Sequence, residues 1–408
     1  MMTKGKIILS VILLTAIGCS EAQQKSWGER IAETVMLSHP DSIVVKKYVT
    51  HGNEKAEKKV ATSPAMWDYE QGVVLKGFDR LWKHTHNKAY FQYMKKIMDR
   101  FVQPDGSIRT YDLLDYNIDD VTPGQIMLAL YTETKEEKYK KAAALLREQL
   151  TWQPRTKEGG FWHKHRYPYQ MWLDGLYMAE PFYAEYSMLF NQAKDFDDVA
   201  NQFIWMENHS RDSKTGLLYH AWDESKKQRW ANPVTGKSPE FWSRAMGWYM
   251  MALVDVLDYI PQNHPKRDEL ITIFQRISTA VKNYQHSQSY VWYQVTDKAS
   301  IKGNYPEASA SCMFVYAIAK GVRMKYIDKS FSMVARNGFG GILKNFIETD
   351  TNGNIHLTNA CSGAGLGGYP YRDGSYEYYI KEPVRKDDLK GIGPFIQASV
   401  EIELMTKP

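Results

Sequence analysis

The chain has 408 residues, of which 43% are hydrophobic and 24% charged, with a formal net charge of +5. These proportions are ordinary for a globular protein, and they exclude a collagen, a long disordered tail and a small disulfide scaffold. The charge is too small to indicate a nucleic-acid partner. Aromatic residues make up 13% of the chain; they suit either a large helix-packed core or the flat, polar-tipped walls of a carbohydrate site.

The N-terminus has the pattern of an export signal. Lys4 and Lys6 precede an apolar run at residues 7–14, and small residues follow up to Cys19. The run is too short to span a bilayer. Because Ala-Ile-Gly-Cys resembles a bacterial lipobox, we expect a signal peptide over 1–18, lipidation of Cys19, and an exported protein anchored in the bacterial envelope. The alternative is a plain secretory peptide cut near Ala22.

We expect residues 19–30 to form an N-terminal tether and residues 31–408 a single domain. Cys312 and Cys361 are the only other cysteines. They form either one disulfide or two buried thiols. No Cys-x-x-Cys or Cys/His ligand spacing is present, so we expect no metal site.

Apolar residues recur at helical spacing through most of the mature chain, for example over 139–150, 172–186 and 242–256. This periodicity predicts amphipathic helices. Turn-forming residues interrupt it at 103–106, 157–160, 214–216 and 351–353.

A loose repeat follows these breaks. Each unit contains a turn, an aromatic patch, a long loop and a polar residue entering an apolar helix. Asp174, Arg244 and Ser309 hold the last position, at separations of 70 and 65 residues. That length suits a helical hairpin with a functional loop, and roughly six such hairpins fit the chain. We therefore predict an all-α (α/α)6 barrel with an active-site pocket at one end. An open α-solenoid is the alternative.

Asp174 is the first candidate for chemistry. It lies in line with Met171, Met178 and Phe182 on an otherwise apolar helix face. Apolar surroundings disfavour an ionised carboxylate, which is what a general acid requires. The alternative is a carboxylate satisfied by backbone N–H groups in the first turn of its helix.

Asp119 and Asp120 precede Thr122 and Pro123, a pattern typical of a helix start. Capping explains one of these acids but not both. Two acids from different hairpins, one neutral and one ionised, would form an acid/base pair.

His220, Arg244 and Lys164 complete the polar candidates. His220 is followed by Asp223, which we expect to orient it; the alternative is a structural histidine. Arg244 lies between Trp242 and Trp248, and an arginine on an aromatic-lined face suits a carboxylate grip. Its alternative is an internal salt bridge. Lys164 supplies charge at the pocket or is a solvated loop lysine.

The glycine-rich stretch 361–368 lacks the strand, helix and Lys-Ser/Thr of a phosphate-binding loop. Followed by residues 369–375, it is typical of a backbone-rich loop at the rim of a pocket.

Four motifs together resemble glycoside hydrolase family 105, the unsaturated rhamnogalacturonyl and related unsaturated glucuronyl hydrolases. They are Gly-Phe-Trp-His-Lys with Gln-Met-Trp-Leu-Asp-Gly-Leu-Tyr-Met (160–178), Leu-Leu-Tyr-His-Ala-Trp-Asp (217–223), Phe-Trp-Ser-Arg-Ala-Met-Gly-Trp (241–248) and Tyr-Arg-Asp-Gly-Ser-Tyr-Glu-Tyr-Tyr (371–379). The motifs occur in order over most of the mature chain. The resemblance implies an (α/α)6 barrel, in agreement with the hairpin count.

The resemblance also implies a reaction and its residues. The family hydrates the C4=C5 double bond of an unsaturated uronic acid left by polysaccharide lyases, and so releases the aglycone without a nucleophile, metal or cofactor. By motif position Asp174 corresponds to the general acid/base and Asp119 to the supporting aspartate, with Asp120 the neighbouring candidate. His220 and Arg244 match pocket residues, and we expect Trp172, Trp248 and Lys164 to shape the sugar site.

We therefore expect a lipid-anchored, cofactor-independent hydrolase of acidic oligosaccharides, with unsaturated galacturonyl-rhamnose from rhamnogalacturonan as the preferred substrate. The alternatives are an unsaturated glucuronyl hydrolase acting on another acidic glycan, a conventional glycosidase, and a surface glycan-binding lipoprotein. The sequence leaves the oligomeric state open.

Overall fold

The computed structural model describes residues 25–44 and 65–406, and the expected signal peptide and Cys19 lie outside these ranges. The described ranges contain thirteen α-helices: α1 (Trp27–Ser38), α2 (Tyr69–Thr85), α3 (Lys88–Met98), α4 (Gly124–Thr134), α5 (Glu137–Trp152), α6 (Leu173–Leu189), α7 (Asp195–Ser210), α8 (Ser243–Val256), α9 (Arg267–Asn283), α10 (Ala308–Arg323), α11 (Ser332–Phe346), α12 (Tyr376–Lys381) and α13 (Leu389–Thr406). None of these helices combines the length and apolar character needed to cross a membrane.

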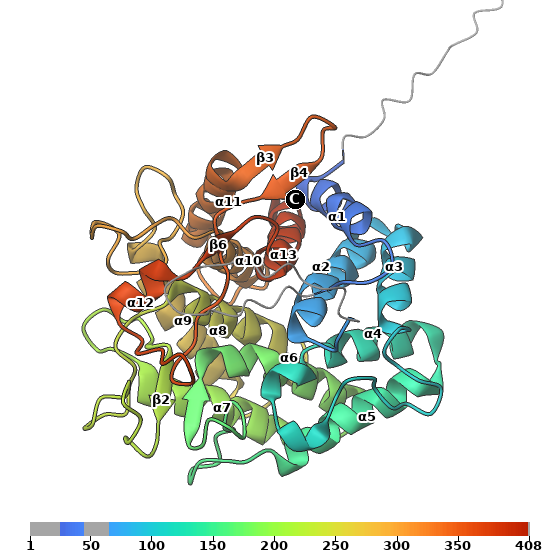
Figure 1. Cartoon of the computed structure of the whole chain (residues 1–408), viewed down its shortest axis with the longest axis horizontal. Helices are drawn as coiled ribbons and strands as arrows, with labels where there is room; N and C mark the ends of the chain where they lie inside the picture. Colours follow the sequence, from blue (N-terminus) through green and yellow to red (C-terminus); the bar gives the residue numbers. More distant parts are fainter. Residues whose placement is uncertain (1–24, 45–64, 407–408) are drawn as a thin grey trace, which may run out of the picture.

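Six helices form a closed inner ring. Going round the ring, α2 contacts α4, then come α6, α8, α10 and α13, and α13 contacts α2 again. In Figure 1 these helices surround the centre of the molecule, while α3, α5, α7 and α11 lie towards its edge. The predicted (α/α)6 barrel is therefore confirmed. The open solenoid is wrong, because a solenoid leaves its first and last repeats apart.

An outer helix covers each inner helix. The pairs α2–α3, α4–α5, α6–α7, α8–α9 and α10–α11 are consecutive in the chain, whereas α13 is covered by α1 from the other end of the sequence. The backbone N–H of Gly28 donates to the Ser399 hydroxyl at 3.0 Å across this last pair. Because inner and outer helices alternate along the chain, all six inner helices run in the same direction.

The two layers differ in burial as their positions require. Every residue of inner helix α8 is buried, because the barrel interior covers one side and the outer layer the other. Outer helix α9 is amphipathic and buries one stripe, Leu270, Ile273, Phe274 and Ile277.

Helix α1 corrects the expected N-terminal boundary, since it begins at Trp27, inside the segment 19–30 that we expected to be a tether. Ser26 caps the helix in a capping box with Glu29. Gly28 lies against α13, so closely that a Cβ at this position would come within 3.3 Å of the Ser399 side chain. The residues from Trp27 onward are therefore part of the barrel wall.

Short antiparallel strands connect the hairpins at one end. β1 (Gln170–Trp172) pairs with β2 (Ala221–Asp223), β3 (Ile347–Thr349) with β4 (Ile355–Leu357), and β5 (Ala360–Cys361) with β6 (Val384–Arg385). Strand β1 leads directly into α6. Cys312 and Cys361 are two free, buried thiols and do not form the disulfide that the sequence also allowed.

The second residue of every inner helix is polar. These residues are Glu70, Gln125, Asp174, Arg244, Ser309 and Lys390. Since the inner helices are parallel, all six positions lie at the same end of the barrel. The repeat of Asp174, Arg244 and Ser309 in the sequence therefore marks equivalent positions on three successive inner helices.

Candidate active site

Asp174 lies next to a buried histidine at the N-terminal end of α6. Its Oδ2 is 3.0 Å from Nε2 of His220. The two atoms are close enough for an ion pair but lack the alignment of a hydrogen bond, as is common at catalytic centres without substrate. His220 is fully buried, whereas the Asp174 side chain keeps 13% of its surface exposed. The carboxylate is thus accessible and the imidazole is not.

The surroundings of Asp174 differ from the expected apolar face. Helical periodicity placed it in line with Met171 and Met178, but at the start of the helix the neighbouring strand brings His220 beside it. The carboxyl group therefore faces a polar partner, and not the apolar surroundings that the periodicity predicts.

Tyr379, not Asp223, contacts the other nitrogen of His220. The Tyr379 hydroxyl is 2.7 Å from Nδ1 of His220. Asp223 instead accepts hydrogen bonds from Ser225 and from the backbone N–H of Lys227 and Gln228, so it stabilises the turn after β2. The expectation that Asp223 orients His220 is wrong, because the two side chains leave the strand towards different neighbours.

Asp119 is held in the ionised state by basic neighbours. It lies in the short 3₁₀ helix Ile118–Val121, where its Oδ2 accepts a hydrogen bond from the Lys164 ammonium. Its Oδ1 is 3.4 Å from Nε2 of His163. Burial would raise the pKa of Asp119, but the positive charge of Lys164 outweighs that effect and lowers it. Asp119 is therefore a fixed negative charge.

Asp120 behaves in the opposite way. Burial, reinforced by the negative charge of Asp119, raises the pKa of Asp120 to about 7. Its carboxylate accepts one hydrogen bond from the Asn117 amide at 2.9 Å. The adjacent acids thus divide into one that is ionised and one that is about half protonated near pH 7.

His163 lies between the two acidic groups. Burial lowers its pKa to about 4, against the opposing effects of Asp119 and Asp174, so it is neutral at ordinary pH. Gly175 makes room for this ring, since a Cβ there would come within 3.0 Å of His163 Nδ1.

Trp172 joins these groups through ring contacts. Its indole stacks on His163 at 4.7 Å and on Tyr167 at 5.0 Å, and meets His220 edge-on at 5.2 Å. Trp172 is the N-cap residue of α6. It therefore connects the Asp119 side of the site with the Asp174 side.

Arg244 forms a buried ion pair at the start of α8. Its Nη2 lies 3.3 Å from Oε1 of Glu307 and also donates to the carbonyl of Cys361, while Nε donates to the Ser309 hydroxyl. Burial opposes the charged guanidinium, but Glu307 outweighs it and raises the pKa of Arg244. Among the described residues Nη1 has no hydrogen-bond partner. The internal salt bridge therefore exists, and it leaves the buried Nη1 without a hydrogen-bond partner among the described residues.

Two tryptophans flank Arg244 in sequence but differ in position. Trp242 lies 5.5 Å from the guanidinium carbon and 4.8 Å from the His220 ring, so it links Arg244 to the Asp174 pair. Trp248 is one turn deeper, 1% exposed, and stacks on Tyr177 of α6 at 4.8 Å. Its packing is that of a core residue.

The structure adds four side chains that sequence reasoning does not select. They are His163, Tyr379, Glu307 and Tyr69. Tyr69 is the first residue of α2, and both Asp119 and Arg244 influence its ionisation. His163 and Tyr379 lie inside motifs quoted above, the first beside Lys164 and the second at the end of 371–379. Their place in these motifs is the signal that could have identified them.

In residues 25–44 and 65–406, no three His, Cys, Asp or Glu side chains are grouped closely enough to hold a metal ion. The polar groups of the site instead contact one another or a backbone carbonyl.

Comparison with known proteins shows similarity to glycoside hydrolases in both sequence and fold. The model of Glycosyl Hydrolase Family 88 matches residues 42–406. A glycoside hydrolase from family 105 of C. acetobutylicum ATCC 824 is 44% identical, with a TM-score of 0.85 over 93% of this chain and 99% of that one. An unsaturated rhamnogalacturonyl hydrolase of Bacillus subtilis is 26% identical over 70% of this chain and 80% of its own length. The unsaturated glucuronyl hydrolase of Bacillus sp. GL1, at 12% identity and a TM-score of 0.66 over 92% of this chain and 95% of that one, shares the fold.

Proposed function

Because the chain belongs to the glycoside hydrolases of families 88 and 105, we propose that it acts on oligosaccharides whose non-reducing end is a 4,5-unsaturated uronic acid. The preferred substrate is unsaturated galacturonyl-rhamnose from rhamnogalacturonan. The similarity to the Bacillus subtilis enzyme supports this choice.

The observation that carries the proposal is the pairing of Asp174 with His220 beside a second, permanently ionised aspartate. A hydration reaction needs one group that gives and takes a proton. The Asp174 and Asp119 side chains are equally exposed, at 13%, but only Asp119 is paired with a lysine ammonium, which leaves Asp174 for that role. A conventional glycosidase needs a second free carboxylate as base or nucleophile. Asp119 is engaged by Lys164 and His163, which makes it poorly suited to that role.

In the proposed reaction Asp174 donates its proton to C4 of the sugar, and the oxygen of a water molecule bonds to C5. The proton released by that water returns to Asp174. The product is a hemiketal at C5, whose ring opens to a ketone as the bond between C5 and the ring oxygen breaks. The opened sugar is a hemiacetal at C1, and its breakdown releases the aglycone with a free hydroxyl group.

The neighbours of Asp174 have separate roles in this proposal. His220, held by Tyr379, stabilises Asp174 when the carboxylate is ionised. The free Nη1 of Arg244 binds the uronate carboxylate, for which a planar guanidinium is well shaped. Asp119 and Lys164 form the polar side of the sugar site, with Trp172 as its flat wall.

The decisive experiment is incubation with a panel of lyase-generated disaccharides, followed by loss of ultraviolet absorbance from the double bond. We expect fastest turnover of unsaturated galacturonyl-rhamnose. Preference for an unsaturated glucuronyl disaccharide would show that the natural substrate comes from another acidic glycan and not from rhamnogalacturonan. Cleavage of only a saturated disaccharide would establish a conventional glycosidase, and tight binding without turnover would establish a glycan-binding protein.

We also propose that the protein is exported and lipid-anchored through Cys19. The basic, apolar and small-residue pattern before Cys19 supports this location. Labelling cells with a fatty-acid analogue should mark the wild-type protein and leave the Cys19→Ala variant unlabelled. Equal labelling of both would contradict the anchor.

A further inference from the structure

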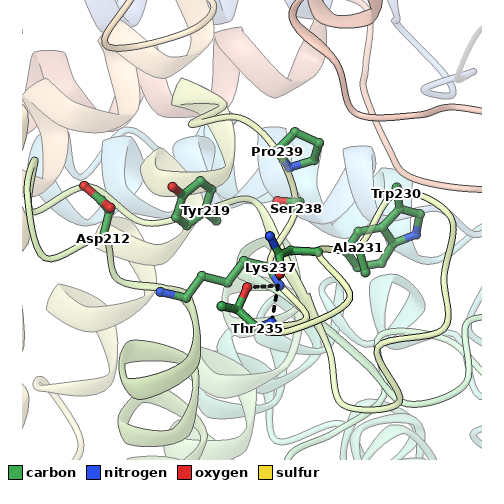
Figure 2. Close-up of a pocket in the computed structure, with 9 residues that line it drawn as sticks. Asp212, Tyr219, Trp230, Ala231, Thr235, Lys237, Ser238 and Pro239 are labelled. Carbon is green, nitrogen blue, oxygen red and sulfur yellow. Dashed lines mark hydrogen bonds between the residues drawn. The ribbon is translucent and has the colours of Figure 1, made fainter.

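A cavity near the catalytic cluster shares no residue with it. It has a volume of about 450 Å³ and is formed by side chains between residues 212 and 239. Figure 2 shows its lining; the residues used below are Asp212, Tyr219, Trp230, Lys237, Ser238 and Pro239. We call this hollow the 212–239 cavity.

The lining of the 212–239 cavity combines flat apolar surfaces with hydrogen-bonding groups. The ammonium of Lys237 lies 5.5 Å from the centre of the Tyr219 ring. Of its three N–H donors, one is given to the carbonyl of Arg211 at 2.6 Å. Oδ2 of Asp212 accepts hydrogen bonds from Thr215, while its Oδ1 accepts none from a described residue. Rings beside free donors and acceptors are typical of a sugar-binding surface.

The 212–239 cavity and the catalytic histidine share the segment that leads into β2. Tyr219, in its wall, directly precedes His220 in the chain. Ser238 holds the next residue, Ala221, by two hydrogen bonds, of 3.0 and 3.1 Å. Trp230 and Ala231 pack in one apolar cluster with Trp172. Trp172, which contacts the His220 ring, therefore also packs in the wall behind the cavity.

The loop over residues 369–375 contacts both the catalytic cluster and the 212–239 cavity. Arg372 in this loop donates to the Tyr167 hydroxyl at 2.9 Å, and Tyr167 stacks on Trp172 of the catalytic cluster. Further along, Gly374 lies so close to Pro239 that a Cβ would come within 3.1 Å of it. The loop thus runs from the wall of the catalytic cluster to the wall of the 212–239 cavity.

We propose that the 212–239 cavity is a subsite for a sugar ring of a longer acidic oligosaccharide, on the reducing-end side of the aglycone sugar. Lys237 binds the carboxylate of that ring, and Asp212 and Tyr219 bind its hydroxyl groups. The inference rests on the proposed function, since the unsaturated end of the same chain occupies the Asp174 cluster. The enzyme then prefers chains longer than a disaccharide.

Hydrolysis of an unsaturated disaccharide and of the matching tetrasaccharide tests the subsite. We expect Lys237→Gln, which can keep the hydrogen bond to Arg211, to lower kcat/KM for the tetrasaccharide about tenfold through KM and to leave the disaccharide unchanged. Tyr219→Phe should act in the same direction more weakly. Lys214→Gln removes the same charge from an exposed position outside the cavity and is the control. Equal effects on both substrates would overturn the subsite.

Binding measured by calorimetry in the Asp174→Asn background separates the two proposals. We expect the tetrasaccharide to bind more tightly than the disaccharide, and Lys237→Gln to remove that difference. Equal affinities would refute the subsite whatever the turnover. Failure of the wild-type enzyme to hydrolyse either compound would refute the proposed function, while the affinities would still show whether the cavity binds sugar.

Discussion

The two ends of the barrel hold their buried charges differently. At the far ends of α2, α8 and α10, Oδ1 of Asp255 accepts hydrogen bonds from Arg80, Tyr316 and Lys320, at 3.0, 2.6 and 2.6 Å. At the N-terminal ends, Asp174 and His220 are close but not aligned, and Nη1 of Arg244 has no partner among the described residues.

This difference separates charges that stabilise the barrel from charges that are available to a ligand. Burial would raise the pKa of Asp255, but Lys320 and Arg80 outweigh it and lower the pKa. Asp255 is therefore held ionised by two cations, although its Oδ2 and Nε of Arg80 have no hydrogen-bond partner among the described residues. In the N-terminal cluster Oδ2 of Asp174, Nε2 of His220 and Nη1 of Arg244 have no hydrogen-bond partner among the described residues, and a charged substrate can supply one.

The largest expected effect comes from Asp174→Asn. We expect kcat to fall by several orders of magnitude, about 10³-fold or more, because the group that gives and takes the proton is lost. The thermal midpoint should change little, since the carboxylate is partly exposed. Asp268→Asn, on an exposed face of α9, is the control. Near-wild-type loss of double-bond absorbance would contradict the assignment.

Lys320→Met tests the opposite end. Removing one partner of a buried ion pair leaves its acid uncompensated, so we expect a loss of about 3–5 kcal/mol in the free energy of unfolding. The kcat of the protein that remains folded should be unchanged. Denaturant unfolding measures the first and the hydrolysis assay the second, with exposed Lys302→Met as control. A fall in kcat without a fall in the free energy of unfolding would contradict the prediction that this cluster only stabilises the barrel.

Asp120→Asn adds a pH dependence to the comparison. The pKa of Asp120 is raised from 3.8 to about 7, so the folded state binds this proton more tightly than the unfolded state does. The contribution of this protonated carboxyl group to the free energy of unfolding is complete below pH 3.8 and is lost as the pH rises towards 7.

We therefore expect Asp120→Asn to stabilise the protein at pH 8 relative to pH 5, by about 2 kcal/mol after allowance for partial exposure. Unfolding of both proteins at the two pH values measures this difference. A stabilisation that is the same at both would show that Asp120 does not titrate in this range.

Tyr379→Phe is the mildest change. It removes the hydroxyl that holds His220, and we expect kcat to fall about tenfold with KM nearly unchanged, equivalent to about 1.4 kcal/mol. Tyr376→Phe, in the same short helix, is the control. An unchanged kcat would mean that Tyr379 only fills space.

The comparison also shows which residues can be predicted. Asp174 and Arg244 are predictable because each marks the start of an apolar helix, a local pattern that recurs along the chain. Glu307 and Tyr379 are not, because their importance comes from contacts with partners 63 and 159 residues away. Asp223 is the wrong partner for His220, since nearness in sequence does not decide where a side chain points from a strand.

The sequence by itself determined that the chain forms helices, that they pair into hairpins, and that a polar residue stands at the start of three inner helices, because helical periodicity and turn chemistry act over short stretches of chain. Closure of the ring decided the rest. Only when α13 packs against α2, and the loops gather at one end, do the residues around Asp174 meet, and long-range contacts of this kind leave no local signature in the sequence.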